Sequence, residues 1–291
     1  MTYQDETLRR VKAIELELLR DFIAVCKQLH LRYFALGGTL LGAVRHQGFI
    51  PWDDDIDVGM PREDYQRFLT EAQALLPETD FLQTWRTDPS YPANFAKLRR
   101  HGTTFVEMSL QNCDIHHGVY IDIFPLDACP SPGAARNWAV FRSNLMLQRL
   151  SGQFYIPHKN VKIRLRQAVT WLLMPSLQAT LERRDRLLSS FRRTGWVANF
   201  CGAWGQREIM PESWYGAGCE LPFEGLRLRV PEDYRSWLRQ VYGDYMCLPS
   251  ETERHGHHHT ACVDPERSYL EYRQKKGGKC CYAPRDHIRN I

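Results

Sequence analysis

The chain has 291 residues, 43% of them hydrophobic and 25% charged, which is enough for one large domain or two smaller ones around a sizeable core. This composition excludes an intrinsically disordered or collagen-like chain. The formal net charge of +4 is too small to indicate a nucleic-acid or membrane partner by itself.

The N-terminal residues 1–6 are polar and acidic, unlike the charged start and apolar centre of a signal peptide. Apolar residues at intervals of three and four then predict an amphipathic helix over residues 5–30. No apolar stretch approaches the length of a membrane span. We therefore expect a cytoplasmic protein whose nine cysteines are reduced.

A strand over residues 32–36, a turn at Gly37 and Gly38 and a helix over residues 39–46 are predicted next. The alternation at residues 56–58 favours a second strand, and Pro61 opens a second helix. The remaining strand candidates of this part lie at residues 81–85, 95–98, 103–106 and 119–124. Residues 1–135 are therefore predicted to form a mixed α/β core.

The section that follows, residues 136–195, is basic and helical. Its residues 136–193 contain twelve Arg or Lys and two acidic residues, a local charge of +10, with aromatic and aliphatic residues at helical intervals. Such a face is typical of a surface that binds an anionic membrane or an acceptor molecule, and equally of an ordinary solvated surface. The C-terminal residues 196–291 are richer in Gly and Pro and are expected to pack on the core.

The acidic residues suggest the chemistry. Asp55 and Asp57 are expected on one side of a strand because strand side chains alternate, so that together they can bind a divalent cation. Carboxylate oxygens select Mg²⁺ or Mn²⁺. Asp122 becomes a third ligand if its strand pairs with the first. Three carboxylates around a metal can orient phosphate and accept a proton from an attacking hydroxyl, as phosphoryl or nucleotidyl transfer requires.

Three segments carry a family resemblance. They are the segment from Gly37 to His46, which begins Gly-Gly-Thr-Leu-Leu-Gly, the segment 48–57, Gly-Phe-Ile-Pro-Trp-Asp-Asp-Asp-Ile-Asp, and the segment 121–127, Ile-Asp-Ile-Phe-Pro-Leu-Asp. They resemble the LicD/fukutin group of phosphotransferases in the nucleotidyltransferase superfamily. The likeness covers most of residues 30–260.

The resemblance implies a nucleotidyltransferase-like fold with a mixed sheet flanked by helices. It implies that Asp55, Asp57 and Asp122 are metal ligands, with Asp122 also a base. Gly37, Gly38 and Thr39 would bind the phosphate of the substrate that donates the transferred group. Arg45 and Lys97 would neutralise the charge of that phosphate, and Trp52 would also contact the donor. Trp52 would stack on the base or on choline, and a buried core position for it is equally consistent with the sequence.

The implied reaction transfers a phospho-alcohol, with phosphocholine from CDP-choline expected, to a hydroxyl of a cell-surface glycan or its lipid-linked precursor. CMP is released, and the basic section would contact the anionic inner face of the membrane. One rival is a metal-dependent glycosyltransferase that uses a nucleotide sugar. Another is a non-catalytic protein that binds RNA or a membrane, although nucleic-acid binding is not expected.

Two clusters of cysteine and histidine leave a structural zinc site open. One consists of residues 255–259 with Cys262, and the other of Cys113, His116 and His117. Neither has the ordered spacing of a zinc finger. His257 and His258 are alternatively expected to face the donor phosphates.

Overall fold

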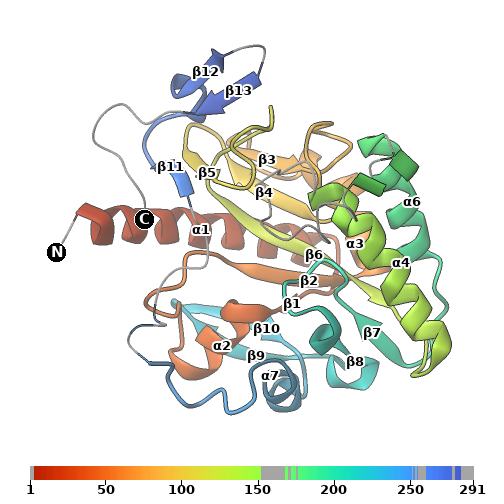
Figure 1. Cartoon of the computed structure of the whole chain (residues 1–291). Helices are drawn as coiled ribbons and strands as arrows, with labels where there is room; N and C mark the ends of the chain where they lie inside the picture. The colour runs from red at the N-terminus through yellow and green to blue at the C-terminus, as the bar shows by residue number, and fades with distance from the viewer. Residues whose placement is uncertain are drawn as a thin grey trace.

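The computed structural model describes residues 3–151, 168–169, 172–174, 176–250, 252, 254, 260–276 and 279–282. It shows a mixed α/β protein around a central sheet (Figure 1), which confirms the predicted fold class. The order of the strands is β1 (Phe34–Ala35), β2 (Asp57–Pro61), β6 (Tyr120–Ala128), β4 (Ala96–Arg100) and β3 (Asp80–Gln83). β2 and β6 are parallel, and the other neighbours are antiparallel.

The central strand is β6, which is buried from its first residue to Asp127. Pro125 is tolerated there because of the register. The backbone N–H of Asp122 donates to the carbonyl oxygen of Ile56, just before β2. The backbone N–H groups of the odd-numbered residues of β6 therefore point toward β4. The pairing with β4 ends at Ile123, and β7 pairs only from Asp127 onward, so no ladder bond is lost at Pro125.

Two helices pack on the sheet. α1 (Tyr3–Gln28) contacts β4 and β6, and α3 (Arg62–Glu71), which continues into the short helix η1 (Ala72–Ala74), contacts β2 and β6. The ring of Phe22 on α1 lies 5.1 Å from the ring of Phe68 on α3, both fully buried. The helices therefore share one core, as the apolar spacing of both segments predicts.

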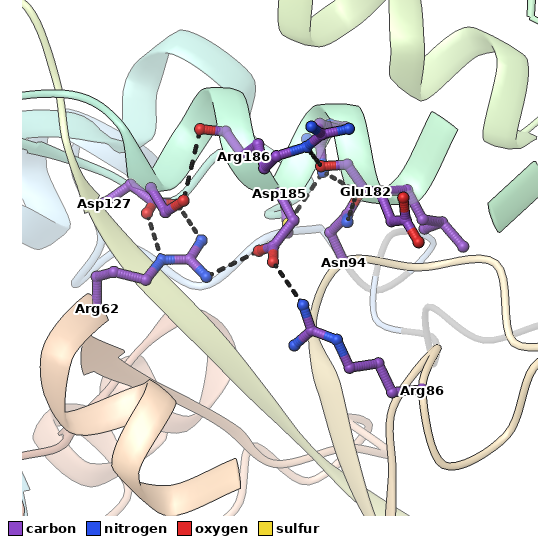
Figure 2. Close-up of polar contacts among 11 residues, drawn as sticks. Arg62, Arg86, Asn94, Asp127, Glu182, Asp185 and Arg186 are labelled. Carbon is purple, nitrogen blue, oxygen red and sulfur yellow. Dashed lines mark hydrogen bonds and ion pairs between the residues drawn. The ribbon is translucent and has the colours of Figure 1, made fainter. Parts of the chain in front are cut away.

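The basic section begins with α4 (Ala134–Ser151) and ends with α6 (Leu177–Ser189), and these two helices pack on each other. Arg62 of α3 joins them to the sheet (Figure 2): its guanidinium binds both oxygens of Asp127 on β6, at 2.6 and 2.8 Å, and Asp185 of α6 at 3.0 Å. Arg86 contacts the other oxygen of Asp185 at 3.5 Å. The residues at 152–167 lie outside the described part of the chain.

The remaining segments extend or cover the sheet. β7 (Trp196–Ala198) pairs with β6 and β8 (Ile209–Pro211), and β9 (Cys219–Phe223) pairs with β10 (Leu226–Val230). The helical segments here are η2 (Gly205–Glu208), η3 (Glu212–Trp214) and α7 (Tyr234–Tyr242). Phe223, Leu228 and Trp237 are buried in the same core as Phe22, so this part packs on the sheet.

Three strands near the end of the described chain lie on one side of α1 in Figure 1, the first of them close to the helix and the other two farther away. β11 (Thr260–Asp264) pairs with β5 (Thr104–Glu107), and the short helix η5 (Tyr269–Glu271) precedes a hairpin of β12 (Arg273–Lys276) and β13 (Lys279–Tyr282). Among the helices in the described residues, none combines the length and apolarity needed to cross a bilayer.

Candidate active site

Three neighbouring strands place Asp57, Asp122 and Lys97 side by side. Asp57 pairs with Asp122 across β2 and β6, and Lys97 pairs with Asp122 across β4 and β6. Residues directly opposite each other on adjacent strands point to the same face of a sheet. The two acidic strands are therefore neighbours in register, as a cation shared between them requires.

Lys97 lies among the acidic side chains and is 2% exposed. Its Nζ is 2.8 Å from Oδ1 of Asp122, 3.5 Å from Oε2 of Glu107 and 3.3 Å from the ring centroid of Tyr120. In this structure its ammonium group therefore offsets the charge of the buried Asp122 and of the partly exposed Glu107. A contact with the donor phosphate stays a prediction.

Asp55 precedes β2 instead of lying within it, because the strand begins at Asp57. It belongs to a run in which one oxygen from each of Asp53, Asp54 and Asp55 lies within 4.8 Å of the others. Asp53 and Asp54 are buried, and Asp55 is partly exposed. Within the described residues, this run is the one group of three or more possible metal ligands so closely spaced.

The electrostatics of the site favour a bound cation. Burial raises the pKa of Asp57 well above its ordinary value, and the charges of Asp55, Asp122 and Asp53 raise it further. Burial and then the charge of Asp55 likewise raise the pKa of Glu15 on α1. Buried carboxylates that repel one another are a donor set for a hard divalent cation. The residues present therefore fit Mg²⁺ or Mn²⁺.

The two glycines at the start of α2 (Gly37–Arg45) make room for carboxylates. Gly37 has a φ of +52°, and a Cβ there would lie 2.6 Å from Oδ2 of Asp57; a Cβ on Gly38 would lie 2.1 Å from Oδ2 of Asp53. The Oγ1 of Thr39 accepts a hydrogen bond of 2.8 Å from the backbone N–H of Asp57. These residues position the acidic side chains, and their predicted contact with donor phosphate is not tested by these contacts.

Arg45 and Trp52 contact the segment that follows α7. The guanidinium of Arg45 donates to the carbonyl oxygen of Tyr245 at 3.0 Å and to Nε2 of His46 at the same distance. Trp52 is partly exposed, with the guanidinium carbon of Arg254 5.6 Å from its ring centroid. Their predicted roles in donor binding stay predictions.

In the described cysteine and histidine cluster, three of the four ring nitrogens have contacts within the protein, whereas Nδ1 of His117 is buried and has no hydrogen-bond partner among the described residues. Nε2 of His116 lies 3.0 Å from Nδ1 of His101, and its Nδ1 accepts the N–H of Gly118. Nε2 of His117 contacts the carbonyl oxygen of Cys113 at 3.1 Å. Burial lowers the pKa of His116 to about 2 and that of His117 to about 4, so both rings are neutral. The other cluster, residues 255–259, lies outside the described residues.

Two acidic residues near the site, Glu15 and Glu107, were not predicted from the sequence. Glu15 is a core-facing position of α1 and is 2% exposed, and Glu107 ends β5 and faces Lys97. The helical pattern could have indicated Glu15, because this carboxylate occupies a position on the apolar face of the predicted helix. No local pattern marks Glu107, because its contact with Lys97 depends on how β4 and β5 pack.

Comparison with known proteins agrees with this arrangement. Residues 30–161 match the family model described as LicD/FKTN/FKRP, nucleotidyltransferase domain. The chain is 29% identical over 262 residues to the lipopolysaccharide cholinephosphotransferase LicD of Haemophilus influenzae, covering 87% of this chain and 96% of that protein. It is 46% identical over 48 residues to the ribitol 5-phosphate transferase FKRP of human and mouse, which is 16% of this chain and 10% of that protein.

The fold and the site thus define a mixed α/β protein with carboxylates gathered where two neighbouring parallel strands begin. The matched domain contains the glycine pair, the acidic run, Lys97 and Asp122. Residues 30–161 thus resemble the LicD/FKTN/FKRP nucleotidyltransferase domain, and the similarity to LicD extends over most of the chain.

Proposed function

We propose that this chain is a metal-dependent phosphotransferase that moves a phospho-alcohol from a CDP-linked donor to a hydroxyl of a glycan or of its lipid-linked precursor. CMP is the second product. The family and both relatives support the coarser statement, a phosphotransferase that acts on glycans. The metal and the CDP-linked donor are the finer parts of the proposal.

The observation that carries the proposal is the pairing of Asp57 with Asp122 across parallel strands, with Asp55 ahead of the first strand. Asp55, Asp57 and Asp122 would hold Mg²⁺ or Mn²⁺. When bound, the cation supplies charge neutralisation at the phosphate. Asp122 is the proposed base, because a carboxylate beside the phosphate can take the proton of the attacking hydroxyl.

The other residues of the site bind and orient. Thr39 holds the backbone of Asp57, and Gly37 and Gly38 leave backbone N–H groups of α2 free of side chains for a donor phosphate. Lys97 and Arg45 supply positive charge beside that phosphate. Neutralisation of charge that develops on the transferred group is the main requirement of phosphoryl transfer.

The donor is proposed to be CDP-choline, with phosphocholine as the transferred group. The likeness to the H. influenzae cholinephosphotransferase covers nearly the whole length of both chains, whereas that to the ribitol 5-phosphate transferase covers 48 residues. Trp52 would hold a quaternary ammonium or a base against its ring, as aromatic faces do.

The experiment is a donor panel. The purified chain is incubated with Mg²⁺, candidate glycan acceptors and CDP-choline, CDP-ribitol or a nucleotide sugar, and the released nucleotide and modified glycan are measured. CMP together with a phosphocholine-bearing glycan is expected. Release of UDP or GDP from a nucleotide sugar would support the rival glycosyltransferase and overturn the proposal.

Substitution of each aspartate tests its role in the reaction. Asp55→Asn, Asp57→Asn and Asp122→Asn should each reduce turnover at least 1,000-fold, on the order of the loss of a central electrostatic group. The matched control Glu71→Gln changes an exposed carboxylate that pairs with Arg67 and should keep full turnover. Full activity in any one of the three aspartate variants would remove that residue from the site.

A further inference from the structure

The surface of α4 exposes two large aromatic side chains one turn apart. Trp138 is 60% exposed and Phe141 46% exposed, and their rings stack with centroids 5.6 Å apart. Leu172 and Leu173, farther along the basic section, are 82% and 61% exposed. Scattered surface apolar residues are ordinary, but adjacent aromatic rings left in water point to a surface that something covers.

A groove between α4 and α6 adjoins the aromatic pair, because Arg142 and Leu145 of its wall lie within one turn of Phe141. Its volume is about 710 Å³. Three arginines line it, Arg142 from α4 and Arg183 and Arg186 from α6, over an apolar floor that includes Leu145, Met146 and Leu187. Among the described residues, no carboxylate forms an ion pair with these three guanidinium groups.

Most of the other described arginines of this section make contacts within the fold. Arg149 and Arg184 are buried, and their guanidinium groups donate to protein atoms. Arg136 lies over the ring of Trp196, and Arg193 pairs with Glu63. The positive charge of the described helices that remains available therefore concentrates at the groove, next to the exposed apolar side chains.

We propose that this α4–α6 surface docks on an anionic phospholipid membrane. Lipid phosphates would contact Arg142, Arg183 and Arg186, each of which would raise partitioning about fivefold near such a surface. Trp138 and Phe141 would enter the interfacial layer, where aromatic rings are favoured. Aromatic residues that bind RNA usually stack on bases from a sheet or a channel, whereas these two lie on a helix beside arginines.

The docking surface and the carboxylate site are separate parts of the molecule. Asp122 stands near the start of β6, and α4 begins six residues after that strand ends. The strand from Asp122 to Ala128 alone spans roughly 20 Å at 3.3 Å per residue. A membrane on the α4–α6 surface would thus leave the acidic site open, and the proposal does not depend on the function proposed above.

Vesicle co-sedimentation tests the charge. The full chain is mixed with vesicles of phosphatidylcholine alone or with phosphatidylglycerol added, at low and high salt. Binding is expected only to the anionic vesicles and should weaken as salt rises. The triple variant Arg142→Gln, Arg183→Gln, Arg186→Gln should lose about 100-fold in partitioning. The matched control Arg9→Gln, Arg67→Gln, Arg227→Gln removes three exposed charges elsewhere and should partition like wild type.

A second variant tests the apolar contact. Trp138→Ser with Phe141→Ser should lose the binding that persists at high salt while unfolding at the wild-type temperature, because both rings are exposed. Leu270→Ser, at a side chain 56% exposed on η5, is its control. Equal binding to neutral and anionic vesicles, or wild-type binding by the arginine variant, would overturn the proposal. So would binding of an RNA homopolymer without binding of vesicles. Turnover on a water-soluble acceptor should be unchanged in all these variants.

Discussion

At the scale of single residues, the site depends on the buried ammonium group of Lys97, which lies among carboxylates. Lys97 Nζ lies 2.8 Å from Asp122 Oδ1, and the side chains are 3% and 8% exposed. A buried ion pair adds little to net stability, yet removal of one partner leaves an uncompensated charge in a medium that solvates it poorly. The structure therefore makes the lysine a requirement of the folded protein before any substrate binds.

Lys97→Met should accordingly lower the free energy of unfolding by about 3–5 kcal/mol in the absence of added metal. The double variant Lys97→Met, Asp122→Asn should recover part of that loss, since the orphaned charge is gone. Urea unfolding of wild type, both single variants and the double variant gives the coupling energy. Purely additive losses would show that the two side chains do not interact.

Glu208 is a second buried carboxyl, 4% exposed, and burial raises its pKa to about 7. The ordinary pKa of this carboxyl is 4.5. Between pH 4.5 and pH 7, the unfolded chain has therefore lost the proton that the folded chain keeps. Folding then takes up a proton, so stability falls as pH rises through this window, by about 3 kcal/mol in all.

Glu208→Gln should remove this fall, because an amide does not titrate. The measurement is the free energy of unfolding of wild type and variant across the window, taken as their difference so that other titrating groups cancel. Parallel curves for the two proteins would contradict the raised pKa.

At the scale of elements, one arginine connects three of them. Arg62 of α3 binds Asp127 of β6 through two hydrogen bonds and Asp185 of α6 through one (Figure 2). Asp127 is fully buried, so its charge has no solvent to replace the guanidinium. The attachment of α6 to the sheet thus rests on a charged network as well as on apolar contact.

Arg62→Met should destabilise the protein by about 3–5 kcal/mol, since the buried Asp127 loses its guanidinium partner and Asp185 keeps only the contact with Arg86. Arg62→Met combined with Asp127→Asn should be more stable than Arg62→Met alone. As a control, Arg32→Met changes an arginine 47% exposed that pairs with Asp64, and should cost less than about 1 kcal/mol. Similar losses for Arg62→Met and Arg32→Met would show that the network contributes no more than a surface pair.

At the scale of the whole molecule, the acidic site predicts that a divalent cation stabilises the fold. A ligand that binds only the native state adds about 2.7 kcal/mol at a concentration one hundred times its dissociation constant. Mg²⁺ should therefore raise the unfolding temperature of wild type, and EDTA should reverse the rise. In Asp57→Asn the rise should be lost. An equal rise in that variant would place the bound ion elsewhere.

Local patterns of residues are enough to predict the helices and strands and the kinds of side chain gathered at the site. The predicted helix at residues 5–30 is α1 (Tyr3–Gln28), and the strand candidate at 119–124 is the start of β6 (Tyr120–Ala128). Periodicity predicts such segments because burial of one face imposes it. The family motifs also placed the carboxylates on particular residues, and the expected function followed from them.

Which of these residues come into contact depends on how distant parts of the chain pack. The register of β2 with β6 places Asp57 beside Asp122, and the packing of β5 brings Glu107 to Lys97. Packing also divides a basic section that is uniform in the sequence, since Arg149 and Arg184 enter the core while Arg142 and Arg183 line an open groove. Pairing between distant strands and the burial of long charged side chains depend on contacts across the chain, and no local pattern contains them.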